Sequence, residues 1–253
     1  MAFPPLRRTK LSDSIVQDVR RLIVARRLEP GDRVMGEQEL VTSYGCSKGT
    51  AREVLKALQV EGLVVTRTGP GGGAYLAAAD SEPAARMLRT FLHFSHLDGA
   101  GVYQVRKVVE PELAVAAVGH LDQAAFAAME ANIAFCARRP RDEEDQRRQR
   151  ILELDFHDIL ADACPNPLLA FIGRFLNGML RDLVVFKGAY KPERHQFSEA
   201  NVSYHRLLLE AYRQGDGDRV QRIMTEHMKD AEGHMCALEE EVERTLLLDV
   251  PRP

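Results

Sequence analysis

Three histidines and a glutamate in the second half of the chain have the types and spacing of a metal site. Glu153 and His157 are four residues apart, so a helix would place both side chains on one face. His205 and His227 each lie on an apolar helical stripe farther along the chain. One carboxylate and three imidazoles can bind a divalent transition-metal ion and leave coordination positions open for water or a ligand. The residues alone leave a second interpretation open, in which each histidine is a hydrogen-bonded core residue.

Short polar and cationic side chains gather near the N-terminus, at the start of a helix that we expect to begin after Ser47. A recognition helix in the DNA major groove presents such side chains on the face away from its core. Arg52 can reach guanine edges with two hydrogen bonds, whereas Ser47, Lys48 and Thr50 suit phosphates or bases. Gly49 lets the backbone approach closely. Each of these residues taken singly is also consistent with an ordinary solvated surface position.

A glycine-rich turn at residues 68–73 separates two β-rich runs, which predicts a β-hairpin. The turn lies between strands and lacks the Lys-Ser/Thr of a P-loop, which argues against a nucleotide site. A flexible wing that contacts DNA fits better. We expect Arg67 and the backbone N–H groups around Gly69 and Gly71 to touch the sugar-phosphate backbone or the minor groove.

These N-terminal side chains need a small domain to position them, and the sequence predicts one at residues 1–79. An apolar stripe behind a Ser12 cap predicts a first helix that ends at Pro30 and Gly31. A second helix is expected from about Gly36, and the third follows after a glycine break. The order helix, helix, tight turn, helix and hairpin is typical of a winged helix-turn-helix.

Residues 80–253 show almost no β pattern and predict an antiparallel all-helical bundle. Glycine, proline and polar turn residues separate apolar-periodic stretches at roughly 83–96, 101–119, 122–138, 143–163, 167–186, 197–214 and 217–246. The expected fold class of the whole chain is therefore mainly α, with the winged helix-turn-helix domain at the N-terminus.

The composition supports a two-domain globular chain of 253 residues, 45% of them hydrophobic and 28% charged. Residues 1–79 hold 12 Lys and Arg against 8 Asp and Glu, whereas residues 80–253 hold 22 against 29. A basic head before an acidic body suits a nucleic-acid-binding N-terminal domain. No apolar run of membrane-spanning length, no signal-peptide pattern and no C-x-x-C pair is visible, so we expect the cytoplasm and no membrane partner.

The N-terminal motifs resemble the signature of GntR-type transcription regulators. The stretches that carry the resemblance are Glu37-Gln38-Glu39-Leu40, Gly45 to Leu55, Glu61-Gly62-Leu63-Val64 and Gly69-Pro70-Gly71-Gly72-Gly73. The resemblance implies binding to operator DNA. Gln38 and Lys48 stand where arginines often contact DNA in that family, which adds Gln38 to the expected contacts.

The helical part resembles the FCD effector domain of the FadR subgroup. The resemblance rests on Arg106 with Glu110, Phe156-His157, Ala163-Cys164-Pro165-Asn166, His205-Arg206-Leu207-Leu208, Gly215-Asp216 and His227. It implies a divalent ion, zinc or nickel, bound by Glu153 in place of the commoner Asp and by His157, His205 and His227. A comparable arginine helps hold the carboxylate of a small acid in that family, which assigns effector binding to Arg106. The alternative is a structural ion pair between Arg106 and Glu110.

The combined interpretation is a ligand-responsive, DNA-binding transcription regulator without catalytic residues. We expect a repressor and a homodimer, because helix-turn-helix heads read two-fold related half-sites. The expected partners are double-stranded operator DNA and a small organic acid. The main alternative is a metal-dependent hydrolase or lyase that uses the His/Glu cluster, but no separate general base is apparent beside the cluster. A metal-storage bundle would need Glu-x-x-His repeats, which the sequence lacks.

Overall fold

The structure, a computed structural model, describes residues 10–69, 71–78, 80–95, 97–186 and 195–248, with side chains described for all of these except 183–186, 195–197 and 236–248. Its contacts divide the chain into two compact units, residues 1–91 and 92–253. The boundary predicted from the sequence lies between residues 79 and 80, whereas the contacts group residues 80–91 with the N-terminal unit. In that segment Ala85 is buried, and the ring of Pro83 lies so close to Gly62 that a Cβ at position 62 would be 2.7 Å away.

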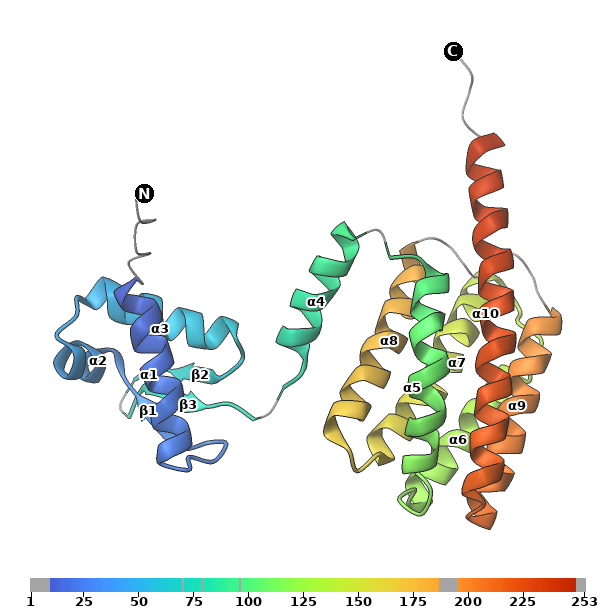
Figure 1. The fold of residues 1–253 in the computed structure, drawn as a ribbon, viewed down its shortest axis with the longest axis horizontal. Coiled ribbons are helices and arrows are strands. Elements are labelled where there is room, and N and C mark those ends of the chain that lie inside the picture. The colour runs from blue at the N-terminus through green and yellow to red at the C-terminus, as the bar shows by residue number, and fades with distance from the viewer. Residues whose placement is uncertain (1–9, 70, 79, 96, 187–194, 249–253) are drawn as a thin grey trace, which may run out of the picture. The chain divides into compact units, whose positions relative to one another are not determined.

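Within the N-terminal unit, the described part of residues 10–78 forms three helices and a three-stranded antiparallel sheet with strand order β1-β3-β2 (Figure 1). The elements are α1 (Leu11–Ala25), β1 (Arg33–Met35), α2 (Glu37–Tyr44), α3 (Lys48–Val60), β2 (Val64–Arg67) and β3 (Gly73–Leu76). Apolar side chains from all of them form one core, including Ile15, Val34, Leu40, Val54, Leu58, Val64 and Ala74. The predicted winged helix-turn-helix is therefore confirmed. The sequence pattern predicted only the β2–β3 hairpin, because the three residues of β1 are too few to show an alternating pattern.

The first helix differs from its prediction at both ends. Ser12 lies inside α1 and is buried, so the prediction that it caps the helix is wrong. The helix also ends before the predicted stop at Pro30. Arg27 takes a left-handed φ of 51°, and the N–H of Leu28 donates to the carbonyl oxygen of Ile23 over 3.1 Å. This Schellman-type end turns Leu28 back onto the core, which closes the helix early.

The rest of the described chain is helical. Its elements are α4 (Glu82–Phe94), α5 (Gly99–Ala116), α6 (Gln123–Cys136), α7 (Glu143–Ala163), α8 (Pro167–Phe186), α9 (His195–Gln214) and α10 (Gly217–Leu248). Each follows a predicted helix closely, so the all-helical body is confirmed. The carboxylates of Asp98, Asp122 and Asp142 accept hydrogen bonds from first-turn N–H groups and so cap α5, α6 and α7. None of the described helices combines the length and apolar character needed to span a bilayer.

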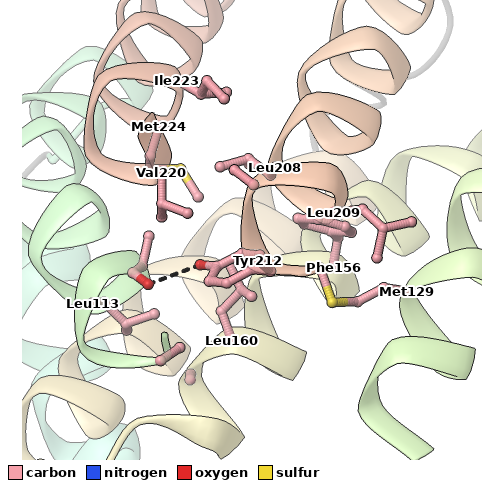
Figure 2. Close-up of a cluster of buried hydrophobic side chains, with 14 of the residues drawn as sticks. Leu113, Met129, Phe156, Leu160, Leu208, Leu209, Tyr212, Val220, Ile223 and Met224 are labelled. Atoms are coloured by element: carbon pink, nitrogen blue, oxygen red, sulfur yellow. Dashed lines mark hydrogen bonds between the residues drawn. The ribbon is translucent and has the colours of Figure 1, made fainter. Parts of the chain in front are cut away.

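The helical unit closes around an apolar core to which α5, α6, α7, α8, α9 and α10 contribute (Figure 2). Phe156 comes from α7, Leu208 and Tyr212 from α9, and Met224 from α10. Burial of each such apolar side chain contributes roughly 1.5–3 kcal/mol. Tyr212 donates its hydroxyl to the carbonyl oxygen of Ala114 over 2.9 Å, the dashed line of Figure 2. Histidines lie on the same core-facing stripes of α7, α9 and α10, so packing of this core fixes the positions of their rings.

Candidate metal centre and nucleic-acid interface

Three imidazoles from three helices meet inside the C-terminal unit. His157 on α7, His205 on α9 and His227 on α10 each offer one ring nitrogen, and these nitrogens all lie within 4.8 Å of one another. The Nε2 atoms of His157 and His227 are 3.3 Å apart. The three residues are 3%, 1% and 2% exposed. The structure thus brings together three of the four residues that the sequence analysis assigned to a metal.

Aromatic and apolar contacts hold the three rings in place. The ring of Phe156 stacks on that of His205, with centroids 3.8 Å apart and planes 4° from parallel. The rings of His157 and His227 stack less closely, with centroids 5.3 Å apart. Met224 and Met228, close to His227 along α10, are fully buried. Because the surrounding core is tightly packed, the ring nitrogens face one another and not solvent.

Several ring nitrogens in this cluster have no hydrogen-bond partner. Both nitrogens of His205 and the Nδ1 of His227 are buried without a partner among the described residues. A buried polar atom without a partner costs about 1–3 kcal/mol, so its presence in a folded protein needs a reason. A metal ion accepts such lone pairs, and imidazole is a preferred ligand of zinc and nickel. The residues present therefore fit a bound divalent ion.

Burial also keeps the unpartnered imidazoles neutral. It lowers the pKa of His205 well below 6.5, and the neighbouring His157 lowers that pKa further. Burial likewise lowers the pKa of His227 well below 6.5, with His205 and His157 as the next causes. Neutral imidazole is the form that binds a metal, so these two rings need not lose a proton to do so near neutral pH.

Glu110 on α5 orients the first imidazole of the cluster. Its Oε2 lies 3.0 Å from the Nδ1 of His157, and both side chains are buried. Burial alone would raise the pKa of Glu110, but His157 and Arg106 outweigh it and hold the pKa at about 2. An ionised carboxylate only accepts hydrogen bonds, so the Nδ1 of His157 donates and its Nε2 lone pair faces the cluster. Metal-binding histidines commonly have such a carboxylate behind them.

The sequence did not predict this contact, because its spacing pairs Glu110 only with Arg106, one helical turn away. That ion pair is present: the Nε and Nη2 of Arg106 donate to Oε1 of Glu110 over 3.1 and 2.8 Å. Arg106 is 1% exposed, and its guanidinium lies 5.1 Å from the ring centroid of Tyr103. Arg106 therefore serves an internal ion pair in this structure, and its role in effector binding stays a prediction.

Glu153, the predicted fourth ligand, is held outside the cluster. Its carboxylate accepts hydrogen bonds from Ser198 Oγ at 3.1 Å, Asn201 Nδ2 at 3.0 Å and Arg150 Nη1 at 3.0 Å. It is not among the ligand atoms that lie within 4.8 Å of one another. Glu153 does share a face of α7 with His157, but donors on α7 and α9 satisfy both of its oxygens. Metal binding by Glu153 stays a prediction.

The residues predicted to contact DNA from α3 lie at the start of that helix. Ser47 is its cap, because the Ser47 hydroxyl oxygen accepts the N–H of Thr50 over 3.1 Å. The Nε of Arg52 donates to Oε2 of Glu37 over 2.9 Å, yet the Arg52 side chain stays 70% exposed. Thr50 is half-buried, and the exposed members of the group are Ser47, Lys48, Gly49 and Arg52.

The predicted contacts of the wing and of α2 share one concave surface. Gln38, Arg67, Gly69 and Gly71 all line a hollow of about 640 Å³. Gly69 and Gly71 have φ angles of 90° and 76°, a left-handed conformation that glycine adopts without strain. The guanidinium of Arg67 lies over the ring of Tyr75, 4.2 Å from its centroid, which orients the cation without neutralising it. The hairpin turn and the start of α2 therefore form a single surface.

Comparison with known proteins places both units in families. Residues 11–73 match bacterial regulatory proteins of the gntR family, and residues 101–230 match the FCD domain. The HTH-type transcriptional repressor NanR of Salmonella newport is 26% identical over 243 residues, which cover 92% of this chain and 88% of the relative. The NanR repressor of Salmonella typhi is 26% identical over 239 residues with the same coverage. A solved structure, Streptococcus agalactiae GntR, covers 87% of this chain and 98% of its own, with 18% identity and a TM-score of 0.56, in agreement with the fold. The chain belongs to the GntR family of DNA-binding transcription regulators, carries an FCD domain as its C-terminal part, and is not the metal-dependent hydrolase or lyase considered from the sequence.

Proposed function

We propose that this regulator is a repressor whose helical unit binds a small carboxylate effector beside a divalent ion, zinc or nickel. The observation that carries the proposal is the cluster of His157, His205 and His227, in which buried neutral rings have unpartnered nitrogens. Three polar rings buried in this way destabilise the fold unless something binds them. An ion bound only by the folded state stabilises it by mass action.

A bound ion would supply an electrophilic position for a carboxylate oxygen of the effector. Three neutral imidazoles and one carboxylate leave a divalent ion with a net positive charge, which favours an anionic ligand over a neutral one. Glu153 is the proposed fourth ligand. To reach the ion, its carboxylate has to exchange its bonds to Ser198 and Asn201 for the metal.

Arg106 is the proposed contact for the effector carboxylate. A guanidinium has five N–H groups, and Glu110 accepts two of those of Arg106. The remaining donors suit a carboxylate, which guanidinium groups bind through paired hydrogen bonds. Glu110 contacts both Arg106 and His157, so a change at Arg106 affects the metal ligand His157 through Glu110.

For the N-terminal unit we propose that Arg52 reads base edges and that Lys48 binds phosphates. Their exposure and their place at the start of α3 support this, because the first turns of a recognition helix lie nearest the bases. Glu37 accepts a hydrogen bond from the Arg52 guanidinium, which reduces the freedom that the side chain loses on binding. The remaining proposed contacts are Gln38, Ser47, Gly49, Thr50, Arg67, Gly69 and Gly71.

The proposed assembly is a homodimer, because two helix-turn-helix heads read two half-sites related by a two-fold axis. Repression is supported by the NanR relatives, which are named transcriptional repressors. The effector must favour one arrangement of the two heads over another, since a ligand with equal affinity for both states shifts nothing.

A gel-shift experiment on the DNA that flanks the gene of this protein tests the proposal. Zinc-loaded and chelated protein are compared in the presence of a panel of mono- and dicarboxylates. We expect at least one acid to weaken operator binding by the loaded protein, and to lose this effect in a His157→Ala, His205→Ala double variant that still binds the operator. An unchanged acid response in that variant would contradict the proposed role of the metal.

A further inference from the structure

A cavity separate from the histidine cluster opens on the helical unit. It measures about 710 Å³ and lies between the chain after α6, the first turns of α7 and the first half of α9. None of the three clustered histidines lines it. Sites for small molecules typically measure about 300–1,000 Å³, so this cavity has the size of a ligand site.

The charge of this cavity is opposite to that of the surrounding domain. Four arginines line it, Arg138, Arg139, Arg150 and Arg206, against one acidic residue, Glu199. Residues 80–253 as a whole hold 22 Lys and Arg against 29 Asp and Glu. A concave surface that concentrates one sign of charge attracts ligands of the other sign. The cavity is therefore an anion-attracting surface on an acidic domain.

Two of its guanidinium groups are free to bind such an anion. Arg139 and Arg206 are exposed and have no hydrogen-bond or ion-pair partner among the described residues. Arg138 lies over the ring of Phe135, 3.9 Å from its centroid, and approaches Asp145 only to 3.9 Å. Asp145 and Glu153 offset part of the charge of Arg138 and Arg150, whereas the positive charge of Arg139 and Arg206 stays available to an anion.

The wall that carries these arginines is held by internal hydrogen bonds. The buried side chain of Gln149 donates through Nε2 to the carbonyl oxygens of Phe135, at 3.3 Å, and Arg138, at 2.7 Å. Asp145 accepts the N–H of Arg141 over 3.1 Å. These bonds tie the chain after α6 to the start of α7. The backbone that presents Arg138 and Arg139 is therefore positioned before any ligand binds, which favours binding.

We propose that this cavity binds a small molecule with two phosphate groups. Arg139 and Arg206 have no ion-pair partner among the described residues, and Arg138 and Arg150 lie beside them, so the cavity offers more guanidinium donors than a single carboxylate ligand needs. Phosphate groups carry more charge, and the planar guanidinium matches their oxygens with paired hydrogen bonds. The ligand is thus distinct from the acid proposed for the histidine cluster.

The fourth arginine links the cavity to the histidine cluster, and this part rests on the proposed metal centre. Arg150 Nη1 donates to both oxygens of Glu153, at 3.3 and 3.0 Å, and its side chain is 11% exposed. A phosphate in the cavity competes with Glu153 for this guanidinium. Glu153 lies one helical turn before His157. A weakened bond to Arg150 leaves its carboxylate held only by Ser198 and Asn201, so less has to be given up for it to turn toward the cluster. Occupancy of the cavity therefore strengthens metal binding.

Calorimetry with fructose 1,6-bisphosphate as the probe tests the cavity, with uncharged fructose and inorganic phosphate as comparison ligands. At low ionic strength we expect the bisphosphate to bind the full-length protein with a dissociation constant below about 1 mM, and fructose not to bind. Arg206→Gln is expected to weaken the bisphosphate about ten-fold. The matched control is Arg222→Gln, which removes an exposed arginine of α10 that does not line the cavity. No binding to the wild type, or equal weakening by both variants, would overturn the assignment.

The link is tested by zinc titrations with and without the bisphosphate. Tighter zinc binding in its presence, lost in Glu153→Gln, is the expected result. Equal zinc affinity under both conditions would overturn the link. Failure of the wild type to bind zinc at all would instead refute the proposed metal centre, while the calorimetry still decides whether the cavity binds phosphates.

Discussion

The two candidate sites hold the same kind of ion pair in opposite surroundings. In the helical unit, Arg106 and Glu110 pair at 2.8 Å with side-chain exposures of 1% and 0%. In the N-terminal unit, Arg52 and Glu37 pair at 2.9 Å with exposures of 70% and 34%. Water screens the second pair and leaves its guanidinium accessible, whereas the first pair is sealed within the core. The buried pair should therefore govern stability, and the exposed pair should govern contact with a ligand.

Loss of the buried arginine should give the largest effect. Arg106→Met leaves the Glu110 carboxylate buried without its cation, and we expect the free energy of unfolding to fall by about 3–5 kcal/mol. Urea denaturation measures the change. The double variant Arg106→Met, Glu110→Leu removes the stranded charge and should recover part of the loss. A decrease below about 1 kcal/mol for Arg106→Met would mean that the buried pair contributes no more to stability than an exposed ion pair does, which would contradict the comparison.

Metal binding should stabilise the helical unit by a comparable amount. At a free zinc concentration of 100 times the dissociation constant, we expect about 2.7 kcal/mol of added stability, seen as a higher melting temperature that chelator reverses. The His157→Ala, His205→Ala variant should not respond. An equal zinc response in wild type and variant would show that the ion binds elsewhere.

Acid should weaken the metal-free helical unit in two steps. Because the folded pKa of His205 and His227 lies well below 6.5, the unfolded state binds more protons as the pH falls below 6.5, and stability is lost there. Glu110 adds stability above its ordinary pKa of 4.5, which is lost as the pH falls toward about 2. Urea denaturation of chelated protein across this range measures both steps. Glu110→Gln should flatten only the second, and a constant stability between pH 7 and 5 would contradict the first.

In the N-terminal unit, Arg52→Ala should weaken operator binding by about 1–3 kcal/mol and relax base preference. Lys48→Ala should weaken binding to all sequences and reduce the slope of affinity against salt by about 1. Fluorescence anisotropy with operator and scrambled duplexes at several salt concentrations separates the two. Equal operator affinity of wild type and Arg52→Ala would remove Arg52 from the interface.

The smallest effect should be that of the exposed pair on stability. Arg52→Ala is expected to change the free energy of unfolding by no more than about 1 kcal/mol, because water replaces the lost contact with Glu37. A decrease as large as that of Arg106→Met in the same urea experiment would mean that Arg52 supports the fold and not the interface.

Periodicity predicted the helices of the body well because each buries one apolar stripe. Phe156, Leu208 and Met224 lie on such stripes, and the histidines beside them were predicted to face the core for the same reason. The apolar pattern does not predict where a helix ends when local backbone geometry determines the end. The early end of α1 depends on a left-handed Arg27, which no apolar period signals.

Contacts between distant segments were not predictable from spacing. Glu110 and His157 are 47 residues apart, and periodicity says which face of each helix is buried but not which faces meet. The i, i+4 spacing of Glu153 and His157 placed both on one face correctly. Ser198 and Asn201, which hydrogen-bond Glu153 and hold it outside the cluster, lie on α9. The spacing of residues within α7 could not predict these contacts.

The central claim is that His157, His205 and His227 hold one divalent ion, and metal content per chain tests it most directly. Protein purified without chelator is analysed for zinc and nickel by mass spectrometry. The account predicts about one ion per chain in the wild type, and little or none in His157→Ala, His205→Ala. A matched control, His93→Ala, His120→Ala, removes two exposed histidines and should keep the wild-type content. Equal metal content in the wild type and in the His157→Ala, His205→Ala variant would contradict the claim.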